Sequence, residues 1–512
     1  MARVSHLLLR GARPVPIGSD EPTAYDGPVD VLVQDGTVTQ VGPGLERPAN
    51  VEEIDAEGRW LVPGLWDQHV HFTQWVETRQ RLDLSGAASV EEAAAIVAGR
   101  VAAEPGRPVI GWGHRSAFMG RDGTTAELDA VSTEVPILLV SGDAHHGWAN
   151  TLAYNLLGLP VRDDVVRENE WFDAYPRIGV LTGGSTDTPE AYRDALAAAA
   201  ALGVVGIVDF EFNGRLQPWV DRWHDGGDLL RVRWATYAAG LDEVLESGLR
   251  TGDPLIDRQS PGADDRLTMG PLKIISDGSL NTRTAWCCDL YADGDVLEHP
   301  AGLPNQSGAE LRSLLGRAAQ GGLEVATHAI GDAAVTEALS AYAETWAKGS
   351  IEHAQLVQRD DVRRIAELGL RASVQPAHLL DDRDLTDLIW PGRSDRCFAF
   401  RWMLDDGVRL VLGSDAPVSP LDPWLSMAAA VHRSGDDRAP WHPEQALTPA
   451  EALAASVDEQ PTVGVGSRGD LVLLDQDPLV DRGSTRETAA ALRGMPVALT
   501  VVAGRVVHRA AG

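Results

Sequence analysis

The sequence predicts an α/β protein: a (β/α)8 TIM barrel with a small β-sandwich domain formed from both termini and a long insertion after barrel strand 1. Three observations predict this fold. Short strand-like runs occur at both ends of the chain, strands and helices alternate between residues 204 and 414, and metal-binding residue types follow several of those strands. A chain of 512 residues is long enough for such a barrel and a second domain.

The two ends of the chain share a pattern of short, alternating strands. Turn signals such as Asp35-Gly36 separate the N-terminal strands, and Asp-Pro and Ala-Gly breaks separate the C-terminal strands. The expected strands are residues 7–10, 30–34, 37–41, 51–55, 470–474, 497–502 and 505–508. The sequence therefore predicts a composite β-sandwich domain from residues 1–62 and 467–512, and a barrel domain at 63–466.

The barrel is expected to begin with the apolar stretch 61–71. An insertion covers about residues 75–200, in which 91–101 and 189–202 are alanine-rich and helical in pattern. Beyond it, strands alternate with helices, which favours parallel pairing with right-handed crossovers. The further strands expected are 204–210, 232–238, 267–276, 323–328, 350–353, 371–375 and 409–414, and the helices are 309–320, 333–346, 359–368 and 398–405. With the first strand these make eight strands, the number that closes a barrel.

The composition excludes several kinds of partner. Lys and Arg total 44 against 75 Asp and Glu, which gives a net charge of −31. Such an acidic surface repels nucleic acid and anionic membranes, and no apolar segment approaches the ~20 residues that span a bilayer. Three cysteines, Cys287, Cys288 and Cys397, are too few for a disulfide framework. We expect a cytoplasmic protein whose partner is a small-molecule substrate, and a homo-oligomer is compatible with the sequence.

Lysine is almost absent from the chain. Only Lys273 and Lys348 are lysines, and arginine supplies the other 42 of the 44 basic side chains. Because a guanidinium stays protonated, arginine cannot replace lysine where a neutral amine must react. Lys273 is therefore a candidate functional residue, and its ordinary alternative is substrate binding or a salt bridge.

Metal-binding residue types stand at the ends of the predicted barrel strands, where barrel enzymes place their functional groups. His69 and His71 share one face of the first strand, because strand side chains alternate. His328 and His353 end the fifth and sixth strands, and Asp415 follows the eighth. A single strand-end histidine is more often hydrogen-bonded than metal-bound, and a single aspartate is more often a helix cap. Their joint occurrence favours a metal centre.

These side chains predict metal-assisted hydrolysis. Neutral imidazoles and a carboxylate suit zinc or a similar divalent ion. If Lys273 takes up carbon dioxide, its carbamate presents two oxygens that can bridge two cations, which gives two metals per chain. Asp415 would accept a proton from metal-bound water, and the hydroxide would attack a carbonyl carbon polarised by the metal or by His353. Asp415 would then pass the proton to the leaving amine, so Asp415 and His353 are the expected catalytic residues.

Five segments together resemble the amidohydrolase superfamily, and in particular its branch of N-substituted formamide deformylases and related metal-dependent hydrolases. The resemblance runs over nearly the whole chain. The segments are 63–71 (PGLWDQHVH), 273–279 (KIISDGS), 326–332 (ATHAIGD), 351–355 (IEHAQ) and 413–417 (GSDAP). The resemblance implies the barrel, the terminal β-sandwich and a metal centre. Its implied ligands are His69, His71, His328, His353 and Asp415, with Lys273 as the carboxylated bridge.

The insertion also resembles that branch, since Asp143, His145, Trp148 and Asn150 match one of its motifs, whereas His146 has no match. The candidate substrate-binding residues are Trp112, His145, Asp277 and Arg283. A Trp-Gly-His run such as 112–114 is more often structural, and Arg283 has the alternative of pairing with a surface acid.

The sequence thus predicts a metal-dependent amidohydrolase that acts on an amide or N-substituted formamide in a small organic molecule. One alternative is the same centre hydrolysing an ester, lactone or carbamate, because attack on a carbonyl does not depend strongly on what leaves. Another is a catalytically silent, metal-binding regulatory protein. The presence of a suitable residue at every expected ligand position speaks against this second alternative.

Overall fold

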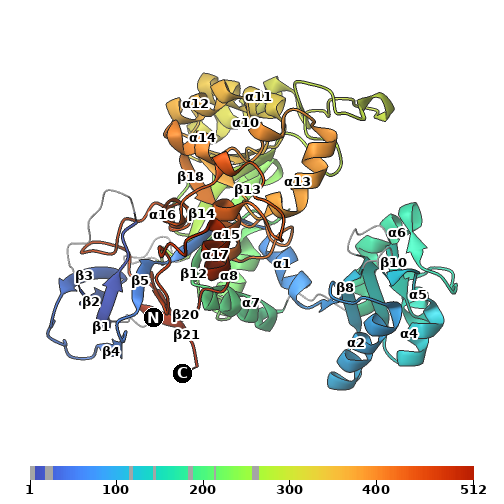
Figure 1. Cartoon of the computed structure of the whole chain (residues 1–512), viewed down its shortest axis with the longest axis horizontal. Helices are drawn as coiled ribbons and strands as arrows, with labels where there is room; N and C mark the ends of the chain where they lie inside the picture. Colours follow the sequence, from blue (N-terminus) through green and yellow to red (C-terminus); the bar gives the residue numbers. More distant parts are fainter. Residues whose placement is uncertain are drawn as a thin grey trace. The chain divides into compact units, whose positions relative to one another are not determined.

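The computed structural model of the chain describes residues 6–17, 27–114, 119–141, 146–182, 188–212, 215–256 and 264–511. The chain divides into two units, one of Met1–Phe72 with Leu196–Gly512 and one of Thr73–Ala195 (Figure 1). The larger unit holds two sheets and the smaller one holds its own sheet. The boundaries of the predicted sandwich and barrel domains remain predictions, because this division separates only the inserted unit from the rest.

The larger unit is built on a sheet of eight strands in which every neighbouring pair is parallel. Its order along the sheet is β18-β17-β16-β15-β14-β13-β12-β6. The strands are β6 (Leu65–Val70), β12 (Val204–Asp209), β13 (Arg231–Tyr237), β14 (Leu267–Ile275), β15 (Val325–Ala329), β16 (Gly349–His353), β17 (Arg371–Val374) and β18 (Arg409–Leu412). The predicted α/β barrel is confirmed.

The sheet closes where β18 meets β6. The backbone N–H of Asp415 donates to the His69 carbonyl at 2.7 Å, and Val70 bridges Ala416. The buried Asp67 carboxylate accepts from the backbone N–H groups of both His69 (3.1 Å) and Ser414 (2.9 Å). A single side chain from the first strand therefore ties the last strand to it.

The apolar stretch 61–71 is two strands rather than the single strand that was expected. β5 (Trp60–Pro63) pairs with strands of the terminal sheet, and β6 begins the barrel at Leu65. Gly64 lies between them, and a Cβ there would stand 2.3 Å from the Val205 side chain. Apolar periodicity does not reveal the break, because both strands are buried.

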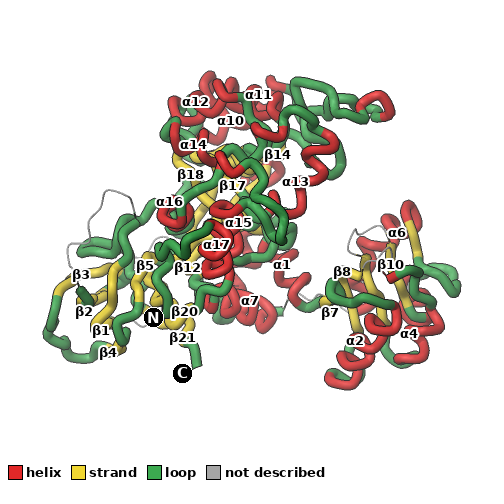
Figure 2. Tube along the Cα trace, in the orientation of Figure 1, coloured by secondary structure: helices red, strands yellow, loops and turns green. Residues whose placement is uncertain are grey.

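Helices follow the barrel strands along the chain (Figure 2). They are α8 (Leu216–His224), α9 (Leu241–Glu246), α10 (Gly308–Gly321), α11 (Asp332–Thr345), α12 (Arg359–Glu367), α13 (His378–Ile389), α14 (Phe400–Asp405), α15 (Pro423–His432), α16 (Pro449–Ala454) and α17 (Thr485–Arg493). Short 3-10 turns η2 (Ala238–Gly240), η3 (Gly294–Val296), η4 (Ser394–Arg396) and η5 (Pro443–Gln445) connect them. Ser307 and Glu310 form a capping box that starts α10, and Gly322 ends it in the left-handed conformation. The sequence did not predict α13, since its four aspartates are weak helix formers.

The terminal sheet runs in the order β21-β20-β19-β5-β1-β2-β3, and β4 also pairs with β1. Its strands are β1 (Leu7–Pro14), β2 (Val29–Gln34), β3 (Thr37–Gly42), β4 (Glu52–Asp55), β5, β19 (Leu471–Leu474), β20 (Val497–Val502) and β21 (Arg505–Arg509). β1 pairs with β4 through Leu7 to Arg10 and with β5 through Arg13 and Pro14. One core holds Leu9 and Val31 of the N-terminal strands together with Leu471 and Val501 of the C-terminal ones. The sandwich is thus built from both termini, as predicted.

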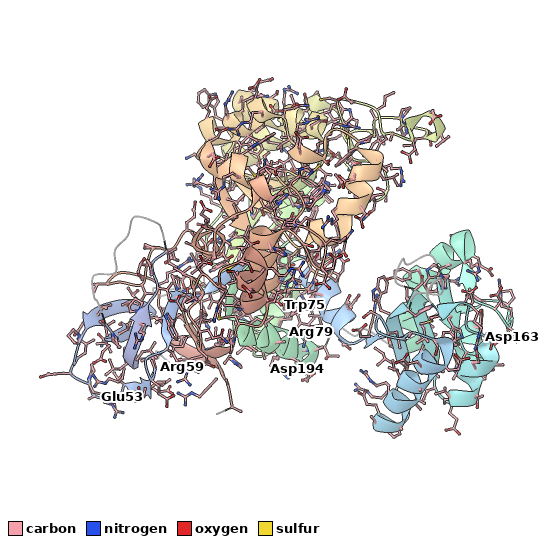
Figure 3. The ribbon with its side chains drawn as sticks, viewed as in Figure 1. Glu53, Arg59, Trp75, Arg79, Asp163 and Asp194 are labelled. Atoms are coloured by element: carbon pink, nitrogen blue, oxygen red, sulfur yellow. The ribbon has the colours of Figure 1, made fainter. Side chains whose placement is uncertain are left out.

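Polar contacts also join the two ends of the chain. Arg59, labelled in Figure 3, lies beside β5. It donates to Asp475 at 2.6 Å and to Glu57 at 2.6 Å. Asp475 immediately follows β19, so this guanidinium connects the N-terminal and C-terminal parts of the sandwich.

The inserted unit has a five-stranded sheet of order β11-β10-β9-β8-β7. α1 (Phe72–Arg79) and α7 (Pro189–Ala201) cross its two boundaries with the larger unit. The elements between them are β7 (Leu82–Asp83), α2 (Val90–Ala103), β8 (Val109–His114), α4 (Thr125–Val131), β9 (Ile137–Ser141), β10 (His146–Ala149), α5 (Thr151–Leu157), β11 (Val166–Arg167), α6 (Glu168–Ala174) and η1 (Tyr175–Thr182). Side chains of β9 alternate between two cores: Ile137 and Leu139 belong to one, and Leu138 and Val140 to the other. The sheet is therefore covered by apolar side chains on both faces.

Within the described ranges, no helix combines the length and apolar character needed to cross a membrane.

Candidate metal centre

The predicted ligands lie at the C-terminal ends of the barrel strands. His69 is the second-last residue of β6, and His71 directly follows that strand. Lys273 is in β14, and His353 ends β16. His328 lies near the end of β15, and Asp415 follows β18. Because the strands are parallel, all six side chains belong to one end of the barrel.

Several of these side chains meet at one point. His69, His353 and Asp415 each offer a ligand atom, and these atoms all lie within 4.8 Å of one another. Asp415 Oδ1 is 3.2 Å from His71 Nε2 and 3.5 Å from His69 Nε2. The Lys273 Nζ atom lies 3.2 Å from His69 Nε2. The structure thus brings these five together.

His328 stands beside this group. Its ring centroid is 4.5 Å from that of His353. Its Nε2 atom faces the Gly278 carbonyl at 3.1 Å, an acceptor to which Nε2–H donates, so the lone pair is on Nδ1. His353 is fixed in the opposite sense, because its Nδ1 atom faces the Gln375 Oε1 atom at 2.8 Å and Nε2 carries the lone pair.

The electrostatics favour neutral imidazoles next to an ionised carboxylate. Burial lowers the pKa of His69 to about 4 and lowers that of His353 well below its usual value. Burial opposes ionisation of Asp415, but its contacts with the rings of His69 and His71 hold the pKa of Asp415 well below its usual value. Neutral imidazole nitrogens and an ionised carboxylate are the donors that a divalent metal such as zinc requires.

Lys273 is buried in a setting that favours its neutral amine. Only 2% of the residue is exposed, and Nζ lies 4.3 Å from the centroid of the Phe210 ring. Burial lowers the pKa of Lys273 to about 8, although the charges of Glu352 and Asp415 oppose this. A fraction of this amine is therefore unprotonated near neutral pH, which is the form that carbon dioxide carbamylates.

The backbone aims two of the ligands. His353 has φ of 69° and Asp415 has φ of 58°, both in the left-handed region that L residues occupy at a cost of about 1 kcal/mol or more. Each stands where its strand ends. At His353 the left-handed turn replaces the next strand position, which would point away from the barrel interior that Glu352 lines. The imidazole and carboxylate donors, the neutral state of the imidazoles and the orientation of these side chains fit a divalent cation.

Asp277 forms hydrogen bonds with the backbone of neighbouring loops, and its contact with a substrate remains a prediction. It is fully buried, and its carboxylate accepts from the backbone N–H groups of Ile330 (3.1 Å), Gly331 (2.9 Å) and Trp286 (2.9 Å). Its Oδ1 atom is 3.4 Å from His328 Nε2. The carboxylate of Asp277 therefore fixes the backbone of the loop that follows His328.

Arg283 pairs with an acidic side chain, which was the alternative to substrate binding in the sequence analysis. Its Nε atom donates to Asp293 at 2.6 Å, and 27% of its side chain is exposed. The pairing of this guanidinium with a surface acid is what the structure shows, and a substrate contact remains only a prediction.

The candidate residues of the inserted unit are partly outside the described residues, since Asp143 and His145 lie there. Trp112 packs against the core that contains Leu138, and the Arg81 guanidinium lies 5.6 Å from its ring. Trp148 donates from Nε1 to the Thr124 carbonyl at 2.7 Å. These contacts give Trp112 and Trp148 structural surroundings.

Asn150 is likewise structural. Its side chain accepts from the Ala153 N–H at the start of α5 and donates to the carbonyls of Ser132 and Val135, both at 2.9 Å. It caps a helix and joins a loop to it, which explains an asparagine at this position.

Sequence reasoning missed three polar neighbours of the centre: Glu352, Gln375 and His378. His378 begins α13, its Nε2 atom is 3.8 Å from Asp415 Oδ2, and its ring is parallel to that of His353 with centroids 6.3 Å apart. A usable signal existed, because residues 375–378 directly follow the seventh barrel strand, the same position at which the other functional residues were sought.

A parallel eight-stranded barrel with imidazoles, a lysine and a carboxylate gathered at its C-terminal end defines a metal-dependent hydrolase of the barrel class. The sequence profile of the amidohydrolase family matches residues 52–508. The chain belongs to the amidohydrolase family.

Individual relatives agree with this family. The chain is 28% identical to Protein LONG AFTER FAR-RED 3 of Arabidopsis thaliana, over 79% of this chain and 74% of that protein. It is 25% identical to N-substituted formamide deformylase of Arthrobacter pascens, over 88% and 90%. The crystal structure of an uncharacterized metal-dependent hydrolase from Pyrococcus furiosus is 26% identical, with a TM-score of 0.73 and coverage of 93% of this chain and 100% of that one. The superfamily that the sequence resembled is confirmed.

Proposed function

We propose that this protein hydrolyses the C–N bond of an amide or N-substituted formamide in a small organic molecule. The observation that carries the proposal is the meeting of His69, His353 and Asp415 within 4.8 Å at the catalytic end of the barrel. The relative named N-substituted formamide deformylase supports the formamide class of substrate.

The proposed cofactor is zinc. The imidazoles of His69, His71, His328 and His353 and the carboxylate of Asp415 would hold it, and a carbamate on Lys273 would allow two ions per chain. When bound, such a cation polarises a carbonyl oxygen and lowers the pKa of a coordinated water molecule toward neutrality.

Asp415 is the proposed proton carrier. Its Oδ1 atom is held by His71, and its Oδ2 atom faces His378, so the carboxylate is oriented on both sides. An ionised carboxylate in this position accepts a proton from the attacking water and delivers it to the leaving nitrogen. His353 would hold the metal through Nε2 and would not donate to the carbonyl oxygen, because its proton is held on Nδ1 by Gln375.

An aromatic surface beside the centre suits an apolar substituent on the substrate. Phe212 stacks on His71 with ring centroids 4.6 Å apart, and 45% of Phe212 is exposed. Tyr237 lies beside it, at 5.8 Å between centroids. A flat apolar group on the leaving amine could stack on this exposed ring.

The first experiment is metal analysis followed by a substrate panel. We expect at least one zinc ion per chain, and turnover of N-substituted formamides or amides that Asp415→Asn lowers by about 10²- to 10⁴-fold. Asp360→Asn is the matched control, because this carboxylate is exposed and pairs with Arg363 in the same helix. Turnover confined to esters, lactones or carbamates would move the proposal to that substrate class. Metal binding without any turnover would favour the regulatory alternative.

Two proposals concern the whole protein. We propose a cytoplasmic location, which the small number of cysteines favours because three are too few for a disulfide framework. We also propose a small-molecule substrate, with neither nucleic acid nor an anionic membrane as a partner, because the net charge is −31.

A further inference from the structure

Glu352, a buried residue of β16, contacts His69 of the proposed metal centre. Glu352 Oε2 is 2.7 Å from His69 Nδ1, and both side chains are 1% exposed. The other carboxylate oxygen, Oε1, accepts a hydrogen bond from the Ser350 hydroxyl. We infer that Glu352 is a positioning residue that fixes the tautomer and the orientation of His69 for metal binding, an inference that rests on the proposed metal centre.

The two nitrogens of His69 have opposite partners. Nδ1 faces a carboxylate, which accepts only, so Nδ1 carries the proton. Nε2 faces the Lys273 amine at 3.2 Å and lies 3.5 Å from Asp415 Oδ1, inside the group of ligand atoms. The lone pair is therefore held on the nitrogen that points into the centre, and a rotated or tautomerised ring would present N–H there instead.

The backbone of β16 is arranged so that two consecutive residues serve this centre. Ser350 and Glu352 share one face of the strand, which lines the barrel interior. His353 would point to the opposite face if the strand continued, and its φ of 69° turns it to the barrel end, where its ring lies 4.9 Å from that of His69. The strand thus supplies one carboxylate behind His69 and one imidazole beside it.

The surroundings of Glu352 differ from those of the other acids in the barrel interior. Glu352 lines a cavity of about 250 Å³ whose wall includes Arg371, the first residue of β17, and Glu324, which directly precedes β15, so the cavity reaches the N-terminal end of the barrel. In the same wall, Glu324 pairs with Arg371 and Asp458 pairs with Arg233. The hydrogen-bond partners of Glu352 are instead His69 and Ser350.

Charge pairing therefore accounts for the neighbouring acids, whereas the contacts of Glu352 lead to a ligand of the centre. A carboxylate behind a ligating histidine raises its basicity and limits its rotation, and its loss commonly weakens metal binding 10- to 100-fold.

The test measures zinc affinity by competition with a chromophoric chelator, in Glu352→Ala, Glu352→Gln and the wild-type protein. We expect the dissociation constant to rise about 10- to 100-fold in Glu352→Ala, and by less in Glu352→Gln, whose amide oxygen can still accept the Nδ1 proton. Glu459→Gln is the matched control, since Glu459 lines the same cavity, is half-exposed and pairs with Arg409. It should bind zinc as the wild type does.

A second readout needs no metal. In metal-free protein labelled with ¹⁵N-histidine, the signals of His69, identified by their loss in His69→Gln, should show a protonated Nδ1 in the wild type and a mixture of tautomers in Glu352→Ala. If Glu352→Ala does not fold, Ser350→Ala provides the same comparison with the carboxylate retained, with a smaller rise in dissociation constant. Wild-type affinity and tautomer in folded Glu352→Ala would overturn the inference. Failure of the wild type to bind zinc would instead overturn the proposed metal centre.

Discussion

Gly413 stands where the last barrel strand approaches the first, and replacing it by alanine should weaken both the barrel and the metal site. A Cβ at this position would lie 2.8 Å from the His69 backbone nitrogen, 2.9 Å from the His69 Cβ atom and 3.2 Å from Asp67 Oδ1. Ordinary contacts of this kind begin at 3.4 Å, so β18 and β6 must separate by about 0.6 Å. Two of these neighbours are rigid backbone or Cβ atoms that cannot turn aside.

We expect Gly413→Ala to cost about 1 to 3 kcal/mol of stability, the usual cost of overpacking. Because Asp415 and His69 move apart with their strands, we also expect zinc affinity and turnover to fall about tenfold, since a 1 Å misplacement can cost a hundredfold. The assay is calorimetric melting together with zinc competition. Gly435→Ala is the control, since its Cβ would meet only Leu380 side-chain atoms at 3.6 Å. A variant at 413 with wild-type melting and zinc affinity would refute this account of barrel closure.

Three further predictions concern single side chains. Asp415→Asn should lower kcat by about 10²- to 10⁴-fold while the folded protein keeps some zinc, and loss of all metal from this variant would show that Asp415 is mainly a ligand. Lys273→Ala should lower the zinc content, from two ions to one or none if the wild-type lysine is carboxylated, as elemental analysis would reveal. Glu451 pairs with Arg401 at a helix start, and the pairing lowers the pKa of Glu451 to about 2. A carboxyl group whose pKa is lowered in the folded state stabilises the fold above pH 4.5, and this contribution is lost as the pH falls toward 2. Glu451→Gln should therefore cost about 1 kcal/mol of stability at pH 7, after allowance for partial exposure, and less at pH 3. Thermal melting at the two pH values measures this.

The meeting of the proposed ligands at one end of the barrel could be predicted from the sequence because barrel topology is regular. Parallel strands bring their C-terminal ends together, so His328, His353 and Asp415 needed only a count of strand–helix units to be placed at one end. The strand period of two put His69 and His71 on one face, and the structure places Nε2 of both within 3.5 Å of Asp415 Oδ1. The succession of strand–helix units and the strand period of two can both be recognised in short segments of the sequence.

The neighbours of the ligands could not be predicted in the same way. Glu352 meets His69 across 283 positions of the chain, and Gln375 meets His353 through a strand pairing whose register the sequence does not state. The partners of Asp277 could not be predicted for the same reason, because they are backbone N–H groups of two other segments. A hydrogen-bond partner depends on which strand lies alongside and at what height, and one sequence does not contain that information.

Barrel closure and the metal centre use the same residues, so stability and function are coupled in this protein. Asp67 ties His69 to Ser414, and the Asp415 N–H donates to the His69 carbonyl, so the contacts that join β6 to β18 also set the distance between two proposed ligands. A cation shared by His69 and Asp415 would span this closure, which no continuous strand ladder secures in the described part of the barrel. Ligand binding to the native state alone raises stability with the logarithm of free ligand concentration over the dissociation constant. Zinc should therefore both support the reaction and stabilise the contact between the first and last strands of the barrel.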